Sequence, residues 1–263
     1  MSRYLVLIKA RLLRMFTWRA MLFAELALNT MFIIILYYFW KAVYFEGKVI
    51  NGMTFGQAFE YIVFASLITA AINTLVEVRV AHLISSGDIV YVLIRPLNFQ
   101  LRLLVESIGG VIINLLCYTI PVLTVFLLIF KPEIQFGINI PCFFVSIAFS
   151  FLINYSISFA FGMLGFYTQA SWGISFFKGF IVSFFSGALI PLNFFHGALQ
   201  KISFLLPFHT IIHTPLMLIT AKGLSGAEAF NYLTQQALWA GVFLVVNLFL
   251  FNKLNQKLIV NGG

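Results

Sequence analysis

The sequence predicts an all-α, polytopic membrane protein with six transmembrane helices. Hydrophobic residues make up 62% of the 263 residues and charged residues only 9%, whereas a soluble domain carries roughly 25% charged residues. The mean hydropathy is +1.01, and the apolar residues gather in runs of the length that a helix needs to cross a bilayer, about 20 residues. The composition excludes a soluble domain. The net charge of +8 is therefore attributed to Lys and Arg in short connectors rather than to a surface that binds nucleic acid.

Six apolar runs are predicted to cross the membrane. They are residues 20–43, 58–76, 104–130, 139–166, 174–194 and 237–252. Eleven of the 16 Lys and Arg residues then fall on the side of both termini, with Lys178 counted there as following the fourth run. Because cytoplasmic connectors are enriched in Lys and Arg, both termini are expected in the cytoplasm, with the chain in the inner membrane of the cell.

The segment 1–19 is predicted to lie as an amphipathic helix in the cytoplasmic interface. Apolar residues at helical spacing form one face, and arginines flank it: Tyr4, Ile8, Leu12 and Met15, with Arg3, Arg11 and Arg14. Such a helix buries its apolar face among lipids while the Arg head groups reach the phosphates. The alternative is a basic retention signal without an ordered helix.

The longest cytoplasmic connector is 77–102, and its residues predict a compact folded knuckle. A short helix is expected from Val78 to Ser85. Gly87 can end it, because glycine adopts left-handed backbone angles without steric cost. Pro96 ends the following segment,.

The stretch 195–221 is apolar but interrupted by Gly197, Pro207 and Pro215. It follows the break Ser186–Pro191, and it is too interrupted for one straight helix. Irregular backbone within a bilayer must be packed in protein or line a cavity. We therefore predict two short re-entrant half-helices that return to the extracellular face.

Polar side chains in the apolar runs leave two alternatives open. Glu25 and Glu106 lie near cytoplasmic ends, where Arg19 and Arg102 can pair with them, or they take part in transport,. Five asparagines are expected to hydrogen-bond between helices, and the alternative is a polar pathway. They are Asn29, Asn73, Asn114, Asn154 and Asn247.

Small residues recur every four positions in the fifth run: Ser175, Gly179, Ser183 and Gly187. This spacing lets another helix approach closely. The neighbouring helix can belong to the same chain or to a second subunit, and the sequence favours neither.

Candidate sites for metal binding and catalysis are weak. His209 and His213 share a helical face, but no third ligand is near, so they are expected to line the external half-helices rather than to bind a metal,. Cys117 and Cys142 lie in apolar runs and are expected to be free,. No phosphate-binding Gly-Lys-Ser/Thr motif and no catalytic set is present, so any ATP must be bound by another polypeptide,.

The order of these motifs resembles the permease subunits of the type-2 ABC exporter superfamily, in its branch of short bacterial permeases. The residues that carry the resemblance are Arg3–Phe16, Glu77–Ser86 with His82, Gly87-Asp88, Arg95-Pro96, Ser186-Gly187 to Pro191, Leu206-Pro207-Phe208 and Pro215. One departure is Phe195-His196-Gly197-Ala198, which stands where relatives often carry Pro followed by Trp.

The resemblance implies that residues 1–263 form one transmembrane domain of a half-transporter. Two permease chains, identical or sister, would join two ATPase subunits that bind ATP and magnesium. The coupling residues would be His82, Gly87, Asp88, Arg95 and Pro96, and the extracellular element would contain Pro191, His196, Pro207, His209 and Pro215. The exported substrate is unknown. The alternative is a transport, scramblase-like or assembly protein that does not use ATP.

Overall fold

The computed structural model describes residues 6–10, 13, 19–45, 49–94, 98–130, 139–168, 170–221 and 223–261, and these form an all-helical protein. The helical elements are α2 (Arg19–Val43), α3 (Phe55–Ile72), α4 (Val76–Ser85), α5 (Ile89–Leu93), α6 (Phe99–Asn114), the π-helical turn η2 (Leu115–Thr119), α7 (Ile120–Phe130), α8 (Asn139–Gly162), the 3₁₀ turn η3 (Met163–Phe166), α9 (Ser171–Phe185), η4 (Leu192–Phe194), α10 (Gly197–Leu205), α11 (His209–Thr220) and α12 (Gly226–Asn261). The prediction of an all-α membrane protein is confirmed.

Five helical segments among the described residues are long and apolar enough to cross a membrane. They are Leu22–Val43, Phe55–Ser85, Phe99–Phe130, Ile140–Phe166 and Gly226–Lys253. They match five of the six predicted runs, and the count becomes six if the bent pair α10–α11 is one span.

The remaining predicted run, 174–194, has different bounds in the structure. Its helix is α9, which has only 15 residues and ends at Phe185. The chain then turns at Gly187, whose φ of +83° is left-handed and stops the helix,.

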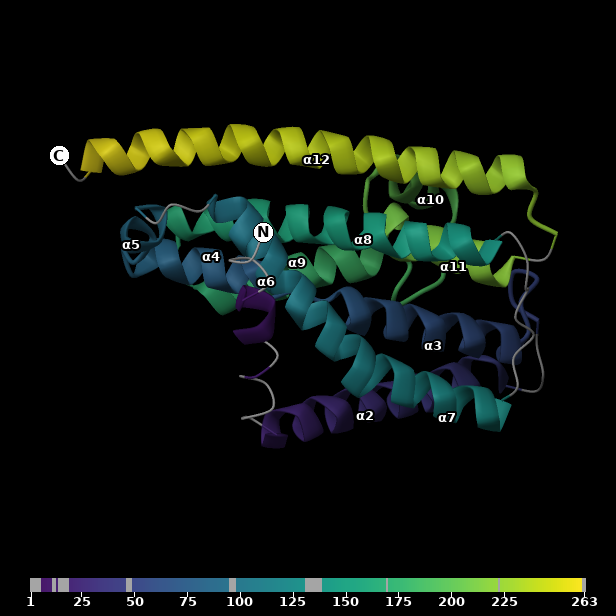
Figure 1. The fold of residues 1–263 in the computed structure, drawn as a ribbon. Coiled ribbons are helices and arrows are strands. Elements are labelled where there is room, and N and C mark those ends of the chain that lie inside the picture. The colour runs from purple at the N-terminus through teal and green to yellow at the C-terminus, as the bar shows by residue number, and fades with distance from the viewer. Residues whose placement is uncertain are drawn as a thin grey trace.

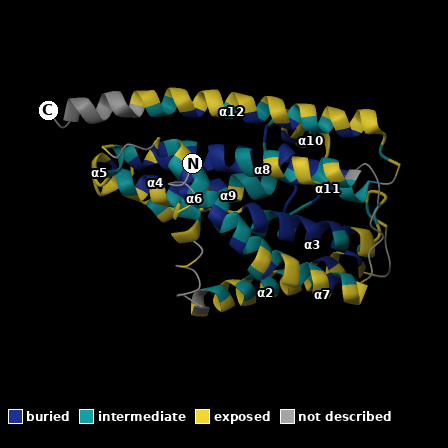
Figure 2. Ribbon diagram, in the orientation of Figure 1, coloured by how far each residue is buried: buried dark blue, intermediate teal, exposed yellow. Residues whose placement is uncertain are grey.

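The two central helices are α3 and α8, and the other helices cover them (Figure 1). In that view α2 and α7 lie on one face of the molecule and α12 lies along the other. Burial follows the same arrangement: α3 is mostly buried and α8 is buried over residues 153–159, while α2 and α12 carry long exposed stretches (Figure 2). The main core joins α3, α8 and α11 through residues such as Ile62, Ile153 and Leu216.

The predicted knuckle is a continuation of the second span. Segment Phe55–Ser85 contains 31 residues, and its two helices, of 18 and 10 residues, amount to about 42 Å of helix against a hydrocarbon thickness of about 30 Å,. The segment is therefore longer than the hydrocarbon core is thick, and α4 and α5 lie at the same end of the molecule as the C-terminal end of α12 (Figure 1). Gly87 separates α4 from α5 with a φ of +78°, as predicted.

Two predicted features lie outside the described residues. Arg95 and Pro96 are not described, and most of the segment 1–19 is not described either. The interfacial helix and the return path of the knuckle therefore stay predictions.

Residues 195–221 form a bent pair of helices. The axes of α10 and α11 differ by 94°, and buried Pro207 lies at the break. The expected break at Pro215 was wrong, because α11 continues through that residue. The missing N–H of a proline removes one helical bond, but residues His209 to Leu216 are all buried, and this packing keeps the helix intact.

A re-entrant pair has a specific signature in cysteine labelling. In a background with Cys117 and Cys142 replaced, we expect Ala198→Cys and Ser225→Cys to react with an impermeant reagent from outside intact cells, and Ser86→Cys to stay protected. All three positions are exposed in the protein. Reaction of Ala198→Cys and Ser225→Cys from opposite sides would instead show that α10–α11 crosses the membrane.

Candidate functional site at the junction of α3 and α4

A short break, residues 73–75, separates α3 from α4, and amide side chains from two other helices donate to carbonyls in the last turn of α3. Asn114 Nδ2 on α6 donates to the carbonyl of Ala70 at 3.0 Å, and Asn154 Nδ2 on α8 donates to the carbonyl of Ile72 at 2.9 Å. A broken helix leaves its last carbonyls without helical partners. These two amides therefore fix the place where the membrane-spanning helix passes into α4.

A buried ion pair lies two residues beyond the break, at the start of α4. Glu77 on α4 and Lys178 on α9 are joined at 3.0 Å, and their side chains are 1% and 6% exposed. Ser175 Oγ donates to the same carboxylate oxygen at 2.8 Å. Lys178 Nζ also donates to Ser158 Oγ on α8 at 3.0 Å, and Thr74 Oγ1 donates to Ser158 Oγ at 3.4 Å. We call these five residues the Glu77–Lys178 cluster.

The prediction that counted Lys178 among the cytoplasmic residues after the fourth run was wrong. Lys178 lies inside α9 and is buried, so ten rather than eleven basic residues remain on the side predicted to be cytoplasmic. A buried charge is tolerated only when it is paired and hydrogen-bonded. The sequence signal for this pair was a single Lys in an apolar helix, three residues after Ser175. Nothing in the sequence identified Glu77 as its partner.

Two glycines bring α4 into close contact with the end of α8. A Cβ atom built on Gly162 would lie 2.7 Å from Val80 Cβ, and one built on Gly165 would lie 2.6 Å from Ala81 Cα. Only glycine allows backbones to approach this closely. Helix α4 is therefore packed directly against α8 and η3.

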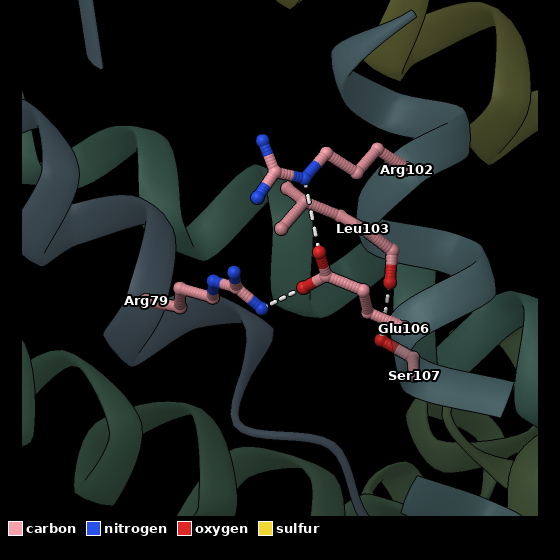
Figure 3. Close-up of polar contacts among 5 residues, drawn as sticks. All are labelled: Arg79, Arg102, Leu103, Glu106 and Ser107. Carbon is pink, nitrogen blue, oxygen red and sulfur yellow. Dashed lines mark hydrogen bonds and ion pairs between the residues drawn. The ribbon is translucent and has the colours of Figure 1, made fainter. Parts of the chain in front are cut away.

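A second ion-pair cluster joins α4 to α6, and Figure 3 shows the Glu106 carboxylate between two arginines. Arg102 Nε contacts Glu106 Oε1 at 2.9 Å, and Arg79 of α4 pairs with the other carboxylate oxygen. The Arg79 side chain is 42% exposed, so its contribution to stability is small. Glu106 thus lies at a contact between α4 and α6, paired with Arg102 and Arg79.

Glu25 is exposed on α2, and its carbonyl accepts a bond from Asn29 Nδ2 at 2.8 Å. Glu25, Asn29 and Asn114 line one cavity of about 40 Å³, together with Asn73. Asn73 and Asn154 line a second cavity of about 70 Å³ between α3, α8, α9 and α11. Members of the predicted glutamate and asparagine sets therefore line two cavities, one on each side of the break between α3 and α4.

The last turn of α4 and the residues that follow it include exposed positions. His82, Gly87 and Asp88 are all exposed, and Asp88 Oδ2 accepts a bond from Ser86 Oγ at 2.9 Å. This tip is therefore accessible at the same end of the molecule as α5.

The four small residues of α9 and its extension have different neighbours. Ser175 binds Glu77, and Gly187 packs on α3, where an added Cβ would lie 2.7 Å from the Tyr61 hydroxyl. A Cβ on Gly179 would meet nothing within 4 Å, and Ser183 lines the 70 Å³ cavity. Of these four small residues, Ser175 and Gly187 therefore make contacts within the chain, while Gly179 has free space beside it.

The predicted external residues are mostly buried around α11. Pro191 is buried and His196 is exposed. His209 Nδ1 lies 2.6 Å from the carbonyl of Leu206, and buried His213 stacks edge-on against Phe204. In the described part of the chain no group of three His, Cys, Asp or Glu side chains could hold a metal ion.

A buried glutamine that the sequence analysis did not single out fixes α11. Gln236 Nε2 of α12 donates to the Thr210 carbonyl at 2.7 Å and to Ser150 Oγ of α8 at 3.1 Å. It therefore holds the bent pair against α8 and α12.

Comparison with known proteins supports the resemblance seen in the sequence. The family model described as ABC-2 family transporter protein matches residues 30–262. Comparisons with curated proteins and with solved structures found no match. The matched part includes every helix from α3 to α12 and most of α2. The chain therefore belongs to the ABC-2 transporter family, as a multi-pass membrane permease component of an ABC transporter.

Proposed function

We propose that this chain forms the translocation pathway of an ATP-driven exporter as one of two permease chains, and that α4 and α5 couple it to separate ATPase subunits. ATP and magnesium are bound by those subunits. The chain lies in the inner membrane with both termini in the cytoplasm, where α4, α5 and the C-terminal end of α12 meet the ATPases.

The observation that carries this proposal is the attachment of α4 to the membrane-spanning helices. The exposed tip with His82, Gly87 and Asp88 is accessible to a partner. The base of the same helix is joined to α9 by a buried ion pair and to α8 by glycine contacts. A movement of the tip would therefore be passed to helices of the pathway rather than lost in a flexible loop.

The return path of the coupling segment is assigned to Arg95 and Pro96. The proline would end the segment after α5, and the arginine would contact an acidic site on the ATPase. The open part of α9 near Gly179 and the exposed face of α2 are available to a second permease chain and to lipids.

The test is the subunit composition of the purified complex. We expect co-expression with its candidate ABC ATPase subunit to yield a detergent-solubilised particle with two permease and two ATPase chains, measured by native mass spectrometry. Gly87→Val, which places a branched side chain at a φ of +78°, should weaken the association. A transport-active particle with one permease chain and no ATPase would contradict the proposal and favour the alternative that does not use ATP.

A further inference from the structure

The cavity between α2, α3, α6 and η2 contains a carboxylate that has no ion-pair partner among the described residues. Glu25 lies in the first turn of the membrane-spanning segment Leu22–Val43, and it lines this cavity. None of the three ion pairs in the described part of the chain includes it. The nearest basic residue along α2 is Arg19, six positions earlier, whereas side chains that meet on one helix are three or four positions apart,. Because an ionised carboxylate within a membrane is costly without a partner, a cationic ligand is favoured here.

The lining of this cavity carries a net negative charge. Glu25 is the one charged residue among the ten described residues that line it, and none of the ten is Lys or Arg. Arg79 and Arg102 make their ion pairs with Glu106, which lies two turns of α6, about 12 Å, from Asn114,. No basic side chain in the lining therefore balances the Glu25 carboxylate.

Two asparagines in the lining offer acceptors to a ligand. Asn29 Nδ2 donates to the carbonyl of Glu25 at 2.8 Å, and Asn114 Nδ2 donates to the carbonyl of Ala70 at 3.0 Å. The oxygen of an amide side chain only accepts hydrogen bonds, and no hydrogen bond among the described residues uses Oδ1 of Asn29 or Asn114. These two oxygens and the Glu25 carboxylate match the three N–H donors of a primary ammonium group.

The size of the cavity also fits a small head group. Its volume is about 40 Å³, against the about 10–15 Å³ that one water needs. A primary ammonium group is small enough, whereas a trimethylammonium group is bulkier and has no N–H donor. Glu25 and Asn73 line the cavity and are exposed, so the cavity is reached from the surface of the protein. Cys117 and Tyr118 complete its polar lining from the π-helical turn η2, and such turns are frequent at functional sites.

We propose that this cavity binds a primary ammonium group, with the Glu25 carboxylate as its counter-charge and Asn29 and Asn114 as further acceptors. The group belongs either to an amphiphile in the membrane or to a small amine in water. The proposal rests on the proposed function in making such an amine the class of exported substrate. Because Asn114 also donates to the last turn of α3, the bound amine lies beside the break at which α4 begins.

The thiol of Cys117 reports occupancy of the cavity in the full-length permease without any ATPase. Both cysteines are free, so a Cys142→Ser background leaves Cys117 as the one thiol. Its rate of modification by N-ethylmaleimide is measured by intact-protein mass spectrometry in detergent micelles near neutral pH. We expect dodecylammonium to give half-maximal protection at about tenfold lower concentration than dodecyltrimethylammonium or dodecanol, because only the primary ammonium donates charge-assisted hydrogen bonds.

Butylammonium distinguishes the two sources of the amine. Protection by butylammonium at a concentration similar to that of dodecylammonium identifies a small amine from water. Protection by dodecylammonium alone identifies an amphiphile. Both results support the proposed site, and protection by neither amine would overturn it.

Three variants show whether the lining residues are responsible. Glu25→Gln keeps the shape of the side chain and removes its charge, and it should abolish the preference for dodecylammonium. Glu228→Gln, at an exposed residue of α12 outside the cavity, is the matched control and should keep the preference. Asn29→Ala should weaken protection severalfold, and its fold should be retained because the described bond of its amide lies within α2.

Equal protection by the three dodecyl probes, or a preference that survives Glu25→Gln, would contradict the proposal. A Cys117 thiol that does not react in the absence of ligand would show that the cavity is closed, and it would overturn the proposal as well. Because no ATPase is present, failure here is distinct from failure of the complex to assemble.

Discussion

Replacing Lys178 with Leu should lower the free energy of unfolding by about 3–5 kcal/mol, because the Glu77 carboxylate would be left buried without its counter-charge. Both side chains are almost fully buried, so solvent does not screen the loss. The Ser175 hydroxyl would be the one described hydrogen-bond partner left to the carboxylate. Unfolding of the purified protein by denaturant in mixed micelles, with the monodisperse fraction from gel filtration, measures the effect.

Two variants show whether the charge itself is responsible. Glu77→Gln/Lys178→Gln should cost much less than Lys178→Leu, since removing both charges of a buried pair is close to neutral. Lys201→Leu changes an exposed lysine in the same way and should have almost no effect. If Lys178→Leu and the double variant destabilise the protein equally, the loss comes from packing and the ion pair is not the cause.

The second large effect is expected at the contact between α4 and η3, the turn that follows α8. In Gly165→Ala the new Cβ would lie 2.6 Å from Ala81 Cα and 2.9 Å from the Ala81 carbonyl oxygen. These are backbone atoms, so the whole of α4 must shift. Overpacking of this kind costs about 1–3 kcal/mol. If this free-energy cost destabilises the native position of α4, it lowers the population of correctly placed α4 by roughly tenfold.

The measured quantity is transport per ATP hydrolysed by the reconstituted complex. We expect Gly165→Ala to lower it by about tenfold while the rate of ATP hydrolysis stays nearly unchanged, because the exposed tip that would meet the ATPase is intact. Gly110→Ala on α6 is the control, since its Cβ meets nothing within 4 Å. A normal transport ratio in Gly165→Ala would show that the contact between α4 and η3 does not carry the coupling.

The features that the sequence predicted are those with a local cause. Membrane-spanning segments follow from the length of apolar runs, and the end of α4 follows from a glycine that adopts a left-handed conformation at position 87. The pair of Arg102 and Glu106 lies four residues apart on one helix, so its contact follows from helical geometry,. The bend at Pro207 likewise has its cause in the residue itself,.

The tertiary structure decided which distant groups meet. Glu77 and Lys178 are about 100 residues apart, and no local rule joins them; their contact exists because α4 and α9 pack on the same side of α8. Packing also determined structure where local sequence patterns predicted otherwise. Helix α11 continues through Pro215 because it is buried. The four small residues of α9 and its extension share one spacing but have different neighbours. The sequence by itself determined the helices, their order and the family, because backbone period and hydropathy act over a few residues. The pairing of Glu77 with Lys178 depends on tertiary packing, because a buried charge is stable only beside a partner, and packing places that partner next to it,.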